Sequence, residues 1–116
     1  MHMTSCKRWD VVVTRFPFVD KAAVRRRPAV CIASMRPKNS VQLYWVLMVT
    51  STELKGWRGD CEVHDLKKAG LPIPSIVRTA KIACVDESVI ERRVGKLDEK
   101  TRRNVSQEIR SNFSGK

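Results

Sequence analysis

The sequence is poor in the residues that build metal sites and nucleotide-binding loops. It has 116 residues with only two histidines, His2 and His64, and no two of its four cysteines form a CxxC pair. This spacing argues against a zinc site and indicates isolated, reduced thiols, as in a cytoplasmic protein. The GxGxxG, Walker, HExxH and GxSxG motifs are absent, which excludes the usual dinucleotide, phosphate-loop, metalloprotease and serine hydrolase sites. We expect no metal and no cofactor.

Long hydrophobic segments are also missing. The longest apolar run covers residues 43–49, far short of the ~20 residues that cross a bilayer. The first eight residues have no apolar core and do not resemble a signal peptide. We therefore expect a soluble cytoplasmic protein with no membrane partner and with residues 1–8 as a flexible tail.

Basic residues dominate what is present. Lys and Arg number 23 against 12 Asp and Glu, which gives a net charge of +11. The excess lies at the two ends: residues 1–40 have nine basic and two acidic side chains, residues 91–116 have eight and four, and residues 41–90 balance. A surface without a binding partner would have positive and negative side chains interspersed, so this distribution indicates a basic face that binds a polyanion.

The size and pattern predict one mainly β domain over residues 1–116. Short β-branched and aromatic segments, bounded by Pro, Gly, Asp or Asn, predict strands at residues 11–16, 29–33, 41–49, 76–85 and 88–94. Their spacing favours a small barrel or two packed antiparallel sheets over βαβ units. Residues 53–75 are expected to form an irregular connection that is long enough to be functional.

A C-terminal helix is predicted over residues 97–112. Asp98 is placed to cap it, and apolar or small side chains recur every fourth residue. They form one stripe, which predicts a helix packed on the barrel wall. The members of the stripe are Leu97, Thr101, Val105, Ile109 and Phe113.

Several polar residues are candidates for nucleic-acid contacts. Arg25, Arg26 and Arg27 precede Pro28, which restricts the backbone of Arg27, and a guanidinium fork matches phosphate oxygens. A solvated basic turn is the alternative explanation. The other candidates are hydroxyl residues and further basic or aromatic residues. Such residues are also common at strand ends and in solvated loops, which is their alternative explanation. These candidates are Thr50, Ser51, Lys55, Trp57, Arg58, Ser75 and Arg78.

Five segments, in order, resemble the MazF/PemK-type toxins. Residues 9–20 (WDVVVTRFPFVD) are similar to the family's opening "GDVVLVPFPFTD", and residues 26–34 (RRPAVCIAS) to its "RRPALVLS". Residues 46–51 (VLMVTS) resemble a strand that ends in "ITS". Residues 69–78 (AGLPIPSIVR) resemble "AGLxxPSxVR", and residues 93–99 (RVGKLDE) the "xxGxLxxE" lead into the last helix.

The resemblance implies a type II toxin of a toxin–antitoxin pair. It implies a small SH3-like or CcdB-like antiparallel β-barrel, a homodimer, and sequence-specific cleavage of single-stranded messenger RNA. It also implies neutralisation by a cognate antitoxin with an acidic disordered segment. By position, it assigns catalysis to Arg27, Thr50 and Arg78. The other candidates named above then become RNA-binding residues.

The chain departs from the family pattern at three places. PemK-like members have an aspartate where Ala80 stands, their following "RTxD" reads ACVD at residues 83–86, and their usual glycine before the first strand is Trp9. The missing aspartate leaves the general base unassigned. An arginine pKa above ~12 suits charge stabilisation rather than proton abstraction. Two other readings stay open: a non-catalytic barrel toxin that inhibits DNA gyrase or topoisomerase, and an RNA-binding module that has lost catalysis.

Overall fold

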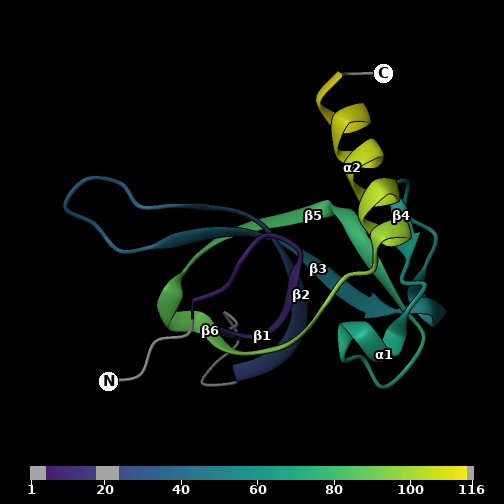
Figure 1. Ribbon diagram of the computed structural model, residues 1–116, viewed down its shortest axis with the longest axis horizontal. Coiled ribbons are helices and arrows are strands. Elements are labelled where there is room, and N and C mark those ends of the chain that lie inside the picture. The colour runs from purple at the N-terminus through teal and green to yellow at the C-terminus, as the bar shows by residue number, and fades with distance from the viewer. Residues whose placement is uncertain (1–4, 18–23, 115–116) are drawn as a thin grey trace.

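The computed structural model describes residues 5–17 and 24–114, and Figure 1 shows their arrangement. Six strands form one antiparallel sheet in the order β4-β5-β3-β2-β1-β6. The strands are β1 (Asp10–Pro17), β2 (Val24–Met35), β3 (Leu43–Ser51), β4 (Asp60–Glu62), β5 (Ser75–Asp86) and β6 (Ile90–Lys96). The helices are α1 (Leu66–Ala69) and α2 (Glu99–Ser114), with 3-10 turns η1 (Thr52–Leu54) and η2 (Glu87–Val89).

The sheet is strongly curved but not closed. Among the described strands, β4 and β6 form its two edges. Register shifts interrupt the ladders between β1 and β6, β2 and β3, and β3 and β5, and such bulges bend a sheet. The predicted mainly β fold with a C-terminal helix is confirmed, while the barrel remains open between β4 and β6.

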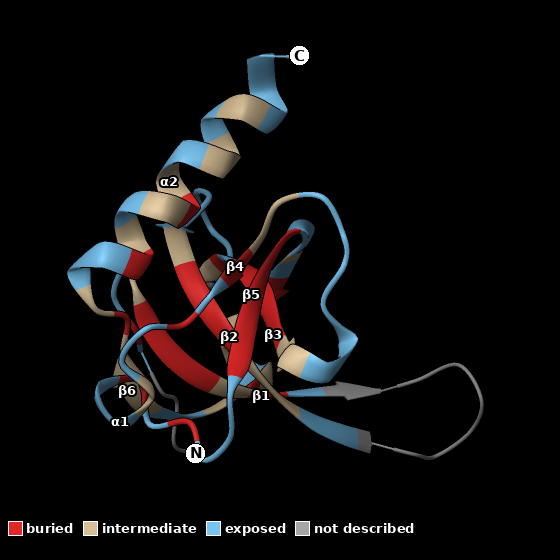
Figure 2. Cartoon of the chain, turned by 90° about the vertical axis from the view of Figure 1, so that its right-hand side faces the viewer, coloured by how far each residue is buried: buried red, intermediate tan, exposed pale blue. Residues whose placement is uncertain are grey.

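Apolar side chains fill both faces of the curved sheet. Adjacent residues of one strand point to opposite faces, so Val11 and Val12 enter different clusters although both are fully buried. Leu47 and Val49 lie on the side of Val11, whereas Met48 lies on the side of Val12. Figure 2 shows the buried stretches running along the middle of the strands. Burial on two sides explains why the strands are continuous apolar runs in the sequence.

The start of the described chain is packed against the sheet. Cys6 is buried, and its backbone N–H donates to the hydroxyl of Tyr44. Trp9 has a φ of 75°, in the left-handed region where glycine is favoured, which fits the glycine expected here from the family pattern. The expected tail spans residues 1–8; its residues 1–4 lie outside the described part, and Cys6 is anchored.

The C-terminal helix begins where the sequence predicts. Asp98 accepts hydrogen bonds from the backbone N–H and the hydroxyl of Thr101, so it caps α2. The stripe packs on the sheet as far as Ile109: Thr101 and Val105 are fully buried and Ile109 is partly buried against the core, but Phe113 is 78% exposed. Figure 2 shows the far end of α2 leaving the body of the sheet. The expectation that the whole stripe lies on the wall is wrong for Phe113 in the last turn. In the parts of the chain described, no helix has the length and hydropathy needed to cross a membrane.

The connection at residues 53–75 is more ordered than the sequence indicates. It contains η1, the edge strand β4 and the short helix α1. Asp65 caps α1 at one end, and Gly70 ends it in the left-handed conformation with a φ of 72°. These elements are very short, which is why their pattern was not visible among the glycines and prolines.

The four cysteines are free thiols, as expected. Cys6, Cys31 and Cys61 are buried, and Cys84 is exposed. Burial raises the pKa of Cys61 to about 11, which keeps it a protonated, unreactive thiol near neutral pH.

Candidate nucleic-acid cleavage site

A cavity of about 490 Å³ opens where the ends of β2 and β3 meet the loop after α1. Its walls are apolar side chains of β1, β3, β6 and that loop. Its polar lining consists of three arginines and three hydroxyl residues: Arg26, Arg27, Arg92, Thr50, Ser51 and Ser75. We call this the arginine cavity. Five of the ten predicted site residues lie here, and none of the described residues that line it is acidic.

Arg27 lies on a strand rather than in a turn. The predicted strand began at residue 29, but β2 already starts at Val24, so the basic run at residues 25–27 pairs with β1. The buried hydroxyl of Thr14 donates a 3.0 Å hydrogen bond to the carbonyl oxygen of Arg27, which fixes the backbone at this point. Within the described residues, the guanidinium of Arg27 has no hydrogen bond or ion pair. Its five donors are therefore available to an anion in the cavity.

Arg26 and Arg92 flank Arg27 and share one carboxylate. The Nε of Arg26 lies 2.9 Å from Glu91, and the Nη1 of Arg92 lies 3.3 Å from the other oxygen of that residue. Arg15 also approaches Glu91. These pairs are partly exposed and each is weak. Sequence reasoning missed Arg92; the basic pair at residues 92–93 was a signal, but only the pairing of Val13 with Arg92 brings it to the cavity.

The three hydroxyl residues differ in whether their side chains already form hydrogen bonds. The Oγ of Ser75 donates to the carbonyl of Ile73 at 2.8 Å, and the Oγ of Ser51 accepts from the N–H of Glu53 at 3.1 Å. Both bonds stabilise turns. The hydroxyl of Thr50 makes no hydrogen bond with the described residues. Thr50 and Arg27 are thus the two uncommitted polar side chains of the lining.

Arg78 does not join this group. It is only 8% exposed, and its Nε and Nη2 donate to both oxygens of Asp60 at 3.1 and 2.9 Å. The same Nη2 donates to the carbonyl of Leu54 at 2.6 Å. Burial raises the pKa of Asp60, but the hydrogen bonds from Arg78, Gly56 and Trp57 outweigh it and leave that pKa below its usual value. The prediction that Arg78 and Arg27 converge on one phosphate is contradicted, because Arg78 is held in a buried structural ion pair.

The remaining candidates lie around the cavity rather than in it. Trp57 is half exposed and covers Arg78, with the guanidinium carbon 4.2 Å from the ring centre. Lys55 forms an exposed ion pair with Glu62. Arg25 and Arg58 are exposed on the surface. None of these four lines the arginine cavity.

Two further features bear on the chemistry of the arginine cavity: the position of Ala80 and the grouping of possible metal ligands. Ala80, at the position of the relatives' aspartate, lines a different cavity and not the arginine cavity. Among residues 5–17 and 24–114, no three His, Cys, Asp or Glu side chains are grouped as metal ligands. The lining of the arginine cavity can therefore supply positive charge and hydroxyl donors to a bound phosphate.

Comparisons with known proteins give a matching family and a similar fold. The model of a family described as "PemK-like, MazF-like toxin of type II toxin-antitoxin system" matches residues 7–113. Among solved structures, the fold is similar to the Mycobacterium tuberculosis toxin MazF-mt6, with a TM-score of 0.68 and 15% identity over 90% of this chain and 96% of that chain. No curated protein matches the chain.

Proposed function

Because the chain belongs to the PemK-like, MazF-like toxins of type II toxin–antitoxin systems, we propose that it is a sequence-specific endoribonuclease. Its substrate is single-stranded messenger RNA in the cytoplasm, and it needs no metal ion. The observation that carries this proposal is the arginine cavity, where the uncommitted guanidinium of Arg27 and the hydroxyl of Thr50 line one space without a competing carboxylate. A phosphodiester is the ligand that such a lining fits.

The proposed reaction uses the ribose 2′-OH as the nucleophile. Its oxygen loses its proton and bonds to the adjacent phosphorus, the bond from phosphorus to the 5′-oxygen breaks, and the 5′-oxygen takes up a proton, so no net proton is gained or lost. The products are a 2′,3′-cyclic phosphate and a 5′-OH. Arg27 stabilises the extra negative charge of the phosphorane, and Thr50 donates a hydrogen bond to the same phosphate. Arg26 and Arg92 attract the neighbouring phosphates. The lining residues are assigned charge stabilisation and not proton abstraction, because none is a carboxylate or an imidazole.

Cleavage of total RNA in excess EDTA tests the proposal. The purified protein is expected to generate new 5′-OH ends at a short recurring sequence. Arg27→Ala should reduce the rate by about 10²–10³-fold, as for loss of one charge-stabilising donor. Arg36→Ala is the matched control: this arginine is exposed on the hairpin after β2, bonded only weakly to Ser40, and its loss should leave the rate unchanged.

Three results would contradict the proposal. If EDTA abolishes cleavage, the reaction depends on a metal. If Arg27→Ala cleaves as fast as the native protein, the arginine cavity is not the site. If the protein binds RNA with steep salt dependence but gives no product, it is a non-catalytic RNA-binding module.

We also propose that the cognate antitoxin covers the arginine cavity with an acidic segment. An acidic disordered chain and RNA are both polyanions, so they compete for Arg26, Arg27 and Arg92. Adding the antitoxin should stop cleavage. The double variant Arg26→Ala with Arg92→Ala should bind the antitoxin more weakly, and its affinity should depend less on the salt concentration. Unchanged affinity in that double variant would place the antitoxin elsewhere.

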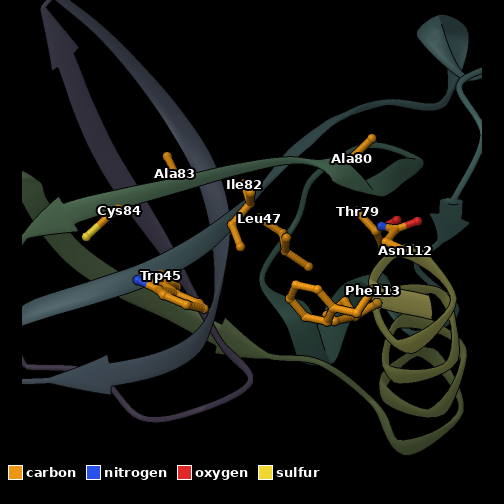
Figure 3. A pocket seen from close by; sticks show the side chains of 10 residues that line it. Trp45, Leu47, Thr79, Ala80, Ile82, Ala83, Cys84, Asn112 and Phe113 are labelled. Carbon is orange, nitrogen blue, oxygen red and sulfur yellow. The ribbon is translucent and has the colours of Figure 1, made fainter. Parts of the chain in front are cut away.

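A homodimer is proposed from a second cavity of about 620 Å³, the apolar groove. It lies between the face of β3 and β5 and the end of α2, and Figure 3 shows Trp45, Ile82 and Phe113 bordering it. Its lining within residues 5–17 and 24–114 has no charged side chain. Two copies with a net charge of +11 repel each other least when they meet through an uncharged face, and an uncharged groove offers no ion pair to an acidic partner. Both points favour a second copy as the occupant.

Sedimentation of the native protein is expected to give a dimer. Ile82→Glu places a charge at a 49% exposed position in the apolar groove and should yield a folded monomer. Val41→Glu, at an equally exposed apolar position outside the groove, is the control and should remain dimeric. A monomeric native protein, or a dimer that survives Ile82→Glu, would contradict the proposal.

A further inference from the structure

The ring of Trp57 lies on a buried cation. The guanidinium carbon of Arg78 is 4.2 Å from the ring centre, and Arg78 is 8% exposed while Trp57 is 50% exposed. A cation at this distance occupies one face of the indole, so the solvent-exposed surface belongs to the opposite face and the edges. One face of the Trp57 ring thus packs on the Arg78 guanidinium, and the other face is open to solvent.

The backbone that carries this ring is fixed by one carboxylate. The Oδ2 of Asp60 accepts hydrogen bonds of 3.0 Å from the N–H groups of Gly56 and Trp57, and both oxygens accept from Arg78. The N–H of Asp60 in turn donates to the carbonyl of Trp57. An exposed aromatic residue on a loop normally samples several orientations, and these bonds remove that freedom before any ligand binds.

The ion pair of Arg78 and Asp60 also connects Trp57 with the arginine cavity. Arg78 donates to the carbonyl of Leu54, and Leu54 lines the cavity. Leu54 is 62% exposed and Ile73, also in the lining, is 51% exposed. Trp57 is the third residue after Leu54, so at most about 11 Å of chain joins their Cα atoms. Exposed apolar side chains therefore lie at the cavity, and the exposed tryptophan follows Leu54 within this short stretch of chain.

We propose that Trp57 is a stacking platform for one base of the RNA whose phosphate occupies the arginine cavity, and that Arg78 and Asp60 position it. The inference rests on the proposed function. A basic cavity explains how the backbone is held, but charge alone does not retain a splayed-out base. Aromatic side chains do so in single-stranded nucleic-acid binders, because every base has a π-face. A pre-ordered ring increases this gain, since no loop entropy is lost on binding.

Binding of two hexanucleotides of equal charge tests the platform. One is a mixed-sequence deoxyribohexamer, which lacks the 2′-OH and cannot be cleaved, and the other is the same backbone without bases. The native protein should prefer the chain with bases. Trp57→Ala should reduce that preference by about tenfold, within the range of single-base stacking, and leave the affinity for the abasic chain unchanged. Trp57→Phe keeps an aromatic face and should retain most of the preference.

The outcomes separate this inference from the proposed function. If the native protein binds neither hexamer and cleaves no RNA, the proposed function has failed. If it cleaves RNA and Trp57→Ala keeps the full preference for bases, the function stands and the platform is overturned. Arg27→Ala should lower the affinity for both hexamers equally, which marks a phosphate contact.

The positioning role has its own readout. Arg78→Lys retains a charge for Asp60 but loses the flat surface under the ring. It should lower the preference for bases without changing the affinity for the abasic chain, and the tryptophan ring should become more mobile in time-resolved fluorescence anisotropy. A native preference in a folded Arg78→Lys protein would leave Trp57 as the platform and remove Arg78 as its positioning residue. If that variant is unfolded by circular dichroism, the Trp57 variants still decide the inference, because Trp57 is half exposed.

Discussion

The buried hydroxyl of Thr14 donates a 3.0 Å hydrogen bond to the carbonyl oxygen of Arg27. The two residues face each other across the β1–β2 ladder. The bond links the core of the sheet to the arginine cavity, because Arg27 projects its side chain from this anchored backbone. The bond makes Thr14 a support for the proposed catalytic arginine.

Thr14→Val should therefore affect both stability and cleavage. The variant keeps the shape but removes the donor, which should cost about 1 kcal/mol in the free energy of unfolding. Cleavage should fall by about tenfold, less than the roughly hundredfold expected for a 1 Å misplacement. Denaturant unfolding and initial cleavage rates provide the two measurements. Thr14→Ser retains the hydroxyl and should keep near-native rates; equal rates in both variants would show that the bond does not position Arg27.

The Asp60–Arg78 pair should make stability depend on acid pH. The pKa of Asp60 is lower in the folded protein than its ordinary value of about 3.9, so its contribution is complete above that value and is lost as the pH falls towards the folded pKa. The denaturation midpoint should be level from about pH 8 to pH 5 and should decline below pH 4. Measuring the midpoint against pH in the native protein and in Asp60→Asn tests this, since the variant should show a shallower decline. Parallel curves would assign the acid sensitivity to other carboxylates.

Removing one partner of this buried pair should destabilise the protein more than replacing both partners. Asp60→Asn leaves a buried guanidinium without its carboxylate and should cost about 3–5 kcal/mol at neutral pH. Asp60→Leu combined with Arg78→Met replaces the pair by apolar groups of similar volume and should recover most of that loss. Thermal unfolding of the two proteins makes the comparison. A double variant no more stable than the single one would mean that the ion pair itself, and not its burial, stabilises the loop.

Asp98→Ala should loosen the junction between the two helices. The carboxylate of Asp98 caps α2 and also accepts a 3.1 Å hydrogen bond from the N–H of Asp65, which precedes α1. Loss of the cap should lower the free energy of unfolding by about 1–2 kcal/mol. Asp98→Asn, which caps helices nearly as well, should stay within a few tenths of a kcal/mol of the native protein. A similar loss in both variants would point to the charge and not to the cap.

Gly70→Ala should be more harmful than Gly56→Ala, although both glycines have positive φ. Gly70 has a φ of 72°, and an added Cβ would overlap the carbonyl oxygen of Val94. Gly56 has a φ of 140° with no atom within 4 Å of an added Cβ, so only its conformation resists substitution. We expect the Gly70 variant to be less stable than the Gly56 variant by about 1–3 kcal/mol, the usual range for overpacking. Chemical denaturation of the two single variants measures the difference, and equal stabilities would show that β6 moves away freely.

The sequence alone was sufficient for the features that depend on neighbouring residues. Short β-branched and aromatic runs between turn residues predict the five long strands, and Asp98 marks the start of the last helix, because strand propensity and helix caps act over a few residues. The short β4 and α1 were missed, since elements of three or four residues leave no periodic signal. The order of five motifs also identified the family.

Only the tertiary structure decided which charged groups share a site. Arg78 finds its carboxylate on a strand 18 residues earlier, and Arg92 reaches the arginine cavity because β6 pairs with β1. A shift of one residue in either register would turn these side chains to the other face of the sheet. The cross-strand register depends on the packing of both apolar faces at once, and no local stretch of sequence contains that information. This is why the basic run before Pro28 could be singled out in the sequence, whereas the buried ion pair between Arg78 and Asp60 could not.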